Sequence, residues 1–191
     1  MARPLAVAIT GGIGAGKSAA LEAFARRGIP TLSSDEVVHR LLREDEDVRA
    51  AVVERFGAGV PDDRSRLASI VFADADRLAW LEALLHPRVA GEYGAWREEL
   101  AREPDPPRIV AVEVPLLYET GGETRFDKVV VVTAPAEVRA ARATLAGDGR
   151  EGRLLPDEEK VRRADFAYVN DGSLEELDAF VAGVLEELRR S

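Results

Sequence analysis

Apolar residues follow two spacings along this chain, and together these predict strands alternating with helices. Continuous apolar runs over 5–10, 109–114 and 129–132 are typical of strands buried on both faces of a parallel sheet. Shorter runs over 30–32 and 166–169 predict two more strands. Elsewhere apolar residues recur at helical spacing, which predicts helices over 18–27, 33–42, 45–56, 65–85 in two parts, 87–102, 135–145, 157–164 and 173–190.

Several residues define the expected helix ends. Ser33 and Glu36 fit a capping box, so a helix is expected to begin there. Gly28 and Gly57 follow apolar helical patterns and are expected to end those helices. Pro87 is expected to open a new helix, because proline is well tolerated in the first helical turn.

This succession of elements predicts an α/β fold, in which helices cover both faces of a parallel sheet. The long helical stretch between the second and third strands is interpreted as an insertion over the carboxyl-terminal edge of the sheet. With 191 residues, 46% of them hydrophobic, the chain is expected to form one domain with a sizeable core.

Composition excludes several classes of protein. The chain has no cysteine, so neither a disulfide framework nor a cysteine metal site is expected. No apolar run has the length of a transmembrane helix, and the first residues lack the apolar region of a signal peptide. A net charge of −9 argues against a broad nucleic-acid interface. These features predict a soluble, cytoplasmic protein that binds neither membranes nor nucleic acid.

The segment 11–18, GGIGAGKS, fits the phosphate-binding pattern G-x-x-x-x-G-K-[ST] between a predicted strand and a predicted helix. Its glycines allow successive backbone N–H groups to point at phosphate oxygens. In this pattern Lys17 reaches the β- and γ-phosphates of ATP, and the Ser18 hydroxyl binds Mg²⁺. Lysine is rare in this chain, with three among 26 lysines and arginines, so a chance match is improbable.

Two classes of phosphate-loop protein differ in the further residues that they require. A nucleotide-switch GTPase requires D-x-x-G and N-K-x-D motifs, and the chain has neither; its one asparagine is Asn170. A small-molecule kinase requires a carboxylate near the acceptor hydroxyl, an acceptor site and cations that cover the transferred phosphoryl group. Asp35 follows the second predicted strand and is the candidate carboxylate, while the helical insertion is the candidate acceptor site. The candidate cations are Arg139, Arg142, Arg150 and Arg153.

Several segments occur in a characteristic order along the chain: the phosphate loop 10–18 (TGGIGAGKS), 28–35 (GIPTLSSD), 86–89 (HPRV), 114–119 (VPLLYE), 156–160 (PDEEK), 164–165 (AD) and 170–173 (NDGS). Together they resemble the dephospho-coenzyme A kinase family. The resemblance extends from about residue 5 to residue 188. Ser33 stands where the family usually has an aspartate, and a serine at a helix N-cap preserves the helix start.

The resemblance implies a P-loop kinase sandwich with a five-stranded parallel sheet of order 2-3-1-4-5. The core would comprise 1–42, 103–138 and 158–191, with an acceptor-binding insertion over about 43–102 and a lid over about 139–157. The implied reaction is ATP-dependent phosphorylation of the ribose 3′-hydroxyl of dephospho-coenzyme A. The alternative is phosphorylation of another small acceptor, such as a nucleoside monophosphate, on the same scaffold.

Individual residues have expected roles, which follow from the phosphate-loop motif, from the resemblance and, for Arg142 and Arg139, from their place on the predicted helix after the fourth strand. Lys17, Asp35 and Arg142 are expected to be catalytic, with Asp35 as the base, and Ser18 is expected to bind Mg²⁺. The expected nucleotide-binding residues are Gly12, Ile13, Gly14, Ala15, Gly16, Lys17, Ser18, Ala19, Arg139 and Asn170. The expected acceptor-binding residues are Asp35, His86, Arg88 and Leu116. Two assignments stay open: Glu113 either forms a buried pair or holds a water on Mg²⁺, and Asn170 either caps a turn or lines the adenine pocket.

Overall fold

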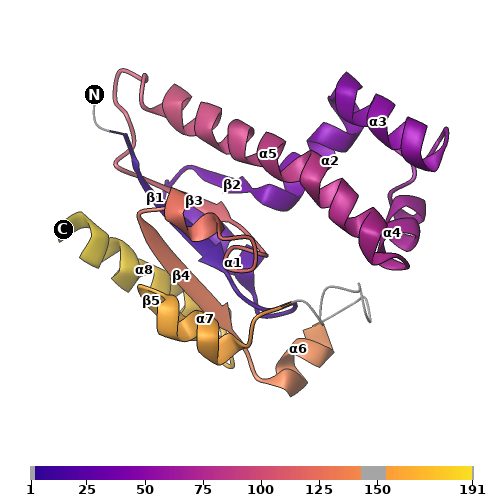
Figure 1. Ribbon diagram of the computed structural model, residues 1–191. Helices are drawn as coiled ribbons and strands as arrows, with labels where there is room; N and C mark the ends of the chain where they lie inside the picture. Colours follow the sequence, from indigo (N-terminus) through magenta and orange to yellow (C-terminus); the bar gives the residue numbers. More distant parts are fainter. Residues whose placement is uncertain (1–2, 143–153, 191) are drawn as a thin grey trace.

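The computed structural model describes residues 3–142 and 154–190. Its centre is a five-stranded parallel sheet of order β2-β3-β1-β4-β5, which confirms the predicted fold class and strand order (Figure 1). The strands are β1 (Leu5–Thr10), β2 (Thr31–Ser33), β3 (Ile109–Glu113), β4 (Lys128–Thr133) and β5 (Phe166–Val169). The helices are α1 (Lys17–Ala25), α2 (Ser34–Glu44), α3 (Glu46–Phe56), α4 (Arg64–Phe72), α5 (Ala75–Leu100), the 3₁₀-helix η1 (Gly122–Arg125), α6 (Ala136–Arg142), α7 (Asp157–Arg163) and α8 (Leu174–Arg190).

Side chains of the central strands alternate between two hydrophobic layers, as the pleat of a strand requires. Val7 and Ile9 of β1 pack with α1 and α8, in a cluster that includes Phe24 and Leu185. On the opposite face, Ala8 packs with residues of the β3–β4 connection, including Leu117 and Tyr118. Because both faces are covered, the central strands consist of continuous apolar residues rather than alternating ones.

A second group of helices packs beside the sheet (Figure 1). Helices α2, α3 and α4 and the first part of α5 share a separate hydrophobic cluster, in which Val37, Val48 and Val52 are fully buried. The later part of α5 contributes Tyr93 to a cluster with β1 and β3. Helix α5 therefore connects this group of helices to the sheet.

Pro87 lies inside α5, so the prediction that it opens a new helix is wrong. An internal proline removes one helical hydrogen bond and costs about 3 kcal/mol. The helix continues because both of its parts are packed: Leu81 and Leu85 before the proline and Tyr93 after it are buried, which stabilises it by roughly 1.5–3 kcal/mol for each large apolar side chain.

Other predicted elements agree with the structure to within a few residues, and Ser33 accepts a hydrogen bond from the Glu36 N–H at the start of α2, as expected for an N-cap. The 3₁₀-helix η1 was not predicted. Within the described ranges, no helix is both long and apolar enough to span a membrane.

Candidate active site

The predicted phosphate loop connects the end of β1 to the start of α1, in the strand–loop–helix arrangement that the motif requires. Gly14 and Gly16 have φ angles of 72° and 102°, in the left-handed region that favours glycine. A Cβ atom on Gly14 would lie 2.9 Å from the Arg139 carbonyl oxygen. The loop can therefore take this shape only because these positions have no side chain.

Lys17 is the first residue of α1, and its ammonium group donates a hydrogen bond of 3.0 Å to the Gly12 carbonyl of the same loop. The N–H groups at a helix start, together with the helix dipole, favour a bound anion. The loop thus combines a lysine ammonium group with the positive end of a helix, and both are suited to phosphate.

Ser18 and Glu113 join the loop to the end of β3. The Ser18 hydroxyl donates a hydrogen bond of 3.2 Å to Glu113 Oε1, and Glu113 is only 6% exposed. Burial raises the pKa of the Glu113 carboxyl above its usual range, the Lys17 ammonium opposes this rise, and the Asp35 carboxylate adds to it. Both the Lys17 ammonium and the Asp35 carboxylate therefore act electrostatically on Glu113.

Asp35 lies in the first turn of α2, immediately after β2, and its side chain is exposed. Strands β1, β2 and β3 are parallel, so their carboxyl ends meet at one edge of the sheet. Lys17, Glu113 and Asp35 each follow or end one of these strands. The sheet therefore gathers an ammonium group and two carboxylates at the edge where ligands bind in open α/β folds.

Asn170 follows β5 and is 4% exposed. Its amide nitrogen Nδ2 donates a hydrogen bond of 2.9 Å to the Ala15 carbonyl within the phosphate loop. Arg142, at the end of α6, donates one of 3.2 Å to the Asn170 carbonyl. Both predicted residues are thus adjacent to the loop, and the Asn170 side chain contacts loop backbone.

Arg139 lies one helical turn before Arg142, against the opposite part of the loop. Its Nη1 atom is 3.4 Å from Asp157 Oδ2, at the start of α7, and would be 2.7 Å from a Cβ atom on Gly12. Its buried Nε atom has no hydrogen-bond partner among the described residues. Asp157 was not among the predicted site residues, although it lies within the segment 156–160, PDEEK, that resembles the family.

The predicted acceptor-binding residues lie on other elements. His86 is exposed on α5, beside Pro87. The Arg88 guanidinium group donates a hydrogen bond of 2.8 Å to the Leu84 carbonyl of its own helix. Leu116 is half-buried in the β3–β4 connection, and its carbonyl accepts from the Thr120 hydroxyl. Arg150 and Arg153 lie outside the described residues.

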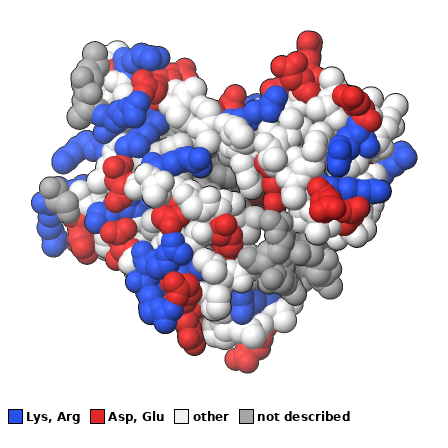
Figure 2. Space-filling view, viewed as in Figure 1, with Lys and Arg blue, Asp and Glu red and all other residues white. Residues whose placement is uncertain are grey.

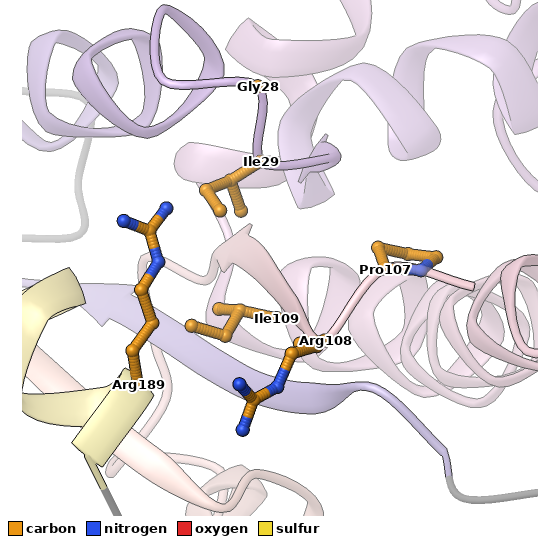
Figure 3. Close-up of a pocket in the computed structure, with 6 residues that line it drawn as sticks. All are labelled: Gly28, Ile29, Pro107, Arg108, Ile109 and Arg189. Atoms are coloured by element: carbon orange, nitrogen blue, oxygen red, sulfur yellow. The ribbon is translucent and has the colours of Figure 1, made fainter. Parts of the chain in front are cut away.

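Two surface features lie apart from this site. A pocket of about 280 Å³ is lined by Gly28 and Ile29 before β2, by Pro107, Arg108 and Ile109 at the start of β3, and by Arg189 of α8 (Figure 3). It is therefore at the amino ends of the strands, opposite the phosphate loop. Over the face shown in Figure 2, basic and acidic side chains are interspersed.

Several known proteins are similar to this chain over nearly its whole length. The family model for dephospho-CoA kinase (CoaE) matches residues 5–176. A dephospho-CoA kinase from Mesorhizobium japonicum is 42% identical over 197 residues, covering 97% of each chain. The crystal structure of TT1252 from Thermus thermophilus is 36% identical, with a TM-score of 0.79 over 98% of this chain and 99% of that one.

A structure of dephospho-CoA kinase from Campylobacter jejuni is 25% identical, with a TM-score of 0.68 over 96% of both chains. The matches extend over nearly the whole chain, and they include the loop, the strand edge and the helices that surround it. From its sequence, its fold and the residues gathered around its phosphate loop, the chain belongs to the dephospho-CoA kinase family.

Proposed function

We propose that this protein transfers the γ-phosphoryl group of ATP to the ribose 3′-hydroxyl of dephospho-CoA, giving CoA and ADP. The observation that supports it most directly is the arrangement of Lys17, the Ser18–Glu113 hydrogen bond and Asp35 at one edge of the sheet. It combines a phosphate-binding cation, oxygen ligands for a metal ion and a carboxylate in the acceptor region, as phosphoryl transfer requires.

The loop and its neighbours fit the triphosphate of ATP. The glycine positions leave backbone exposed for close approach, and the start of α1 favours negative charge. The buried Nε atom of Arg139 is a donor with no partner among the described residues, and buried donors are rarely left unpaired. In this proposal Arg139 and Lys17 bind phosphate oxygens, and Arg142 stabilises the charge that develops during transfer.

The donor set also fits Mg²⁺, which prefers oxygen ligands and usually retains several waters. In this proposal the Ser18 hydroxyl binds the ion directly, and the Glu113 carboxylate, 3.2 Å from it, accepts hydrogen bonds from waters on the ion. When bound, the ion would neutralise charge on the β- and γ-phosphates.

Asp35 is the proposed base. Its exposed carboxylate would accept the proton of the 3′-hydroxyl while that oxygen bonds to the γ-phosphorus and the bond to ADP breaks. The helices over about 43–102 would form the acceptor-binding region, with His86, Arg88 and Leu116 contacting dephospho-CoA. For Arg88 this requires its guanidinium group to leave the Leu84 carbonyl.

Release of ADP by the purified protein with ATP and Mg²⁺ tests this function. Dephospho-CoA is compared with a panel of nucleoside monophosphates and small alcohols, and the product is examined by ³¹P NMR for a 3′-phosphate. We expect turnover with dephospho-CoA that is lost on chelation of the metal. Turnover with a nucleoside monophosphate and none with dephospho-CoA would establish the alternative acceptor class instead.

A further inference from the structure

A largely buried ion pair lies between the β3–β4 connection and α7. Lys160 is 0% exposed, and its Nζ atom is 2.7 Å from Oε1 of Glu119, whose side chain is 9% exposed. The same Glu119 oxygen accepts a hydrogen bond of 3.0 Å from the Leu155 N–H. One carboxylate therefore binds both Leu155, two positions before α7, and a residue within that helix.

This pair is poorly suited to stabilise the fold. The other Glu119 oxygen, Oε2, has no hydrogen-bond partner among the described residues. The Lys160 Nζ atom has none of suitable geometry either, although it forms the ion pair with Glu119. Buried charges lose their hydration, and a well-packed apolar pair of similar volume is often as stable or more so. The observed geometry thus points to a role in positioning rather than in stability.

The element that this pair fixes is the start of α7. Asp157, the first residue of that helix, lies between Leu155 and Lys160 in the chain. Its Oδ2 atom is 3.4 Å from Arg139 Nη1, and its Oδ1 atom would be 3.4 Å from a Cβ atom on Gly12. Movement of α7 would therefore move the carboxylate that holds Arg139 against the phosphate loop.

We infer that Glu119 and Lys160 are positioning residues for nucleotide binding. They fix the start of α7, so that Asp157 orients the Arg139 guanidinium group toward the phosphate loop. This inference rests on the proposed function, in which Arg139 binds phosphate oxygens of ATP. A compact ammonium group suits the role, since it binds a carboxylate as a point charge at the end of a long side chain.

The test replaces the pair with apolar residues, Glu119→Leu with Lys160→Met, and measures binding of a non-hydrolysable ATP analogue by calorimetry. We expect an unchanged or higher Tm and at least about 10-fold weaker analogue binding, the scale expected when a binding group is slightly misplaced. Analogue binding at wild-type affinity in the folded double variant would overturn the inference.

A control pair exists in the same chain. Lys128 Nζ is 2.8 Å from Asp165 Oδ1, and Asp165 Oδ2 accepts from the Val129 N–H at 2.8 Å, at the amino end of β4. The double variant Lys128→Met with Asp165→Leu removes this lysine–carboxylate pair, whose side chains are 38% and 34% exposed, away from the phosphate loop. It should leave affinity for the analogue unchanged, and an equal loss of affinity would show a general structural effect and overturn the inference.

Asp157→Asn provides a second test that does not depend on folding of the buried double variant. If Asp157 positions Arg139, Asp157→Asn should weaken binding of the analogue. Adding Arg139→Ala to this variant should then cause no further loss of affinity. Tighter binding would show that Asp157 only competes with phosphate for Arg139, which would overturn the inference. Because analogue binding is measured without an acceptor, failure of the dephospho-CoA assay alone would contradict the proposed function and leave this inference standing.

Discussion

The side-chain amide of Asn170 donates a hydrogen bond of 2.9 Å to the Ala15 carbonyl, joining the turn after β5 to the middle of the phosphate loop. The same amide nitrogen would lie 2.1 Å from a Cβ atom on Gly16. A side chain at position 16 would thus displace Asn170 as well as strain the loop. Asn170 therefore has a structural effect on the loop. Neither interpretation from the sequence, a turn cap or an adenine contact, included this effect.

Gly16→Ala should abolish nucleotide binding. The substitution forces alanine into a left-handed φ of 102° and against the Asn170 amide, which costs about 1–2 kcal/mol for the backbone alone. Calorimetry with an ATP analogue tests this. Gly28→Ala is the matched control, because Gly28 also has a positive φ of 73° but nothing within 4 Å of the added Cβ. That variant should lose some stability and keep its affinity.

Lys17→Ala should reduce turnover to background. The Lys17 ammonium group is proposed to bind the β- and γ-phosphates of ATP, where negative charge is redistributed during phosphoryl transfer. The measurement is kcat for ADP release at saturating ATP. Lys128→Ala, which removes a lysine at the amino end of β4, should retain normal turnover. If Lys17→Ala also turned over normally, Lys17 would have no part in the reaction.

Asp35→Asn should lower kcat by roughly 10²–10⁴-fold, the usual contribution of a positioned general base. Affinity for ATP should change little, because the proposed role of this carboxylate is toward the acceptor. Glu36→Gln is the control, since it alters a neighbouring exposed carboxylate in the same helical turn. A normal kcat with a lower Tm for Asp35→Asn would show that Asp35 only stabilises the start of α2.

Arg142→Ala should depress kcat by about 10³-fold, at the low end of the effects of a catalytic arginine in phosphoryl transfer. Arg142→Lys should restore part of the activity, because an ammonium group lacks the planar fork of a guanidinium group. Arg162→Ala, at an exposed arginine of α7, is the control. A kcat within a few-fold of wild type for Arg142→Ala would reject this assignment and make Arg139 or Arg150 the candidate catalytic arginine.

Asp178→Asn should lower stability at neutral pH and have little effect in acid. Asp178 of α8 accepts hydrogen bonds from Arg27 at 2.6 Å and Arg26 at 3.0 Å, and these hold the pKa of its carboxyl well below the usual value. An acid with a depressed pKa stabilises the folded state above its unfolded pKa, and this contribution is lost as pH falls through the folded value.

Thermal unfolding at several pH values measures this effect. We expect Asp178→Asn to lower Tm by a few degrees at pH 7, a difference that narrows below about pH 4, the unfolded pKa of aspartate. Asp105→Asn in an exposed loop should leave Tm unchanged at every pH. A deficit for Asp178→Asn that stays constant down to pH 2 would exclude the ionised carboxylate as its cause.

Features that depend on neighbouring residues could be predicted from the amino-acid sequence alone. The phosphate loop is defined by glycines and Lys17 at fixed spacing, and the buried strands by continuous apolar runs such as 129–132. Ser33 indicated the start of α2 because a helix cap acts within three residues. These features are local, since backbone conformation and burial of one face follow from short-range patterns.

Features that depend on contacts between distant residues became evident only in the folded structure. Helix α5 continues through Pro87 because packing on both sides offsets the lost hydrogen bond, which no local rule reveals. Glu113 and Asn170 obtain their partners, Ser18 and Ala15, across 95 and 155 positions of the chain. Periodicity specifies which residues are buried, but only the packed fold specifies which buried polar groups meet, because each must find a partner once water is excluded.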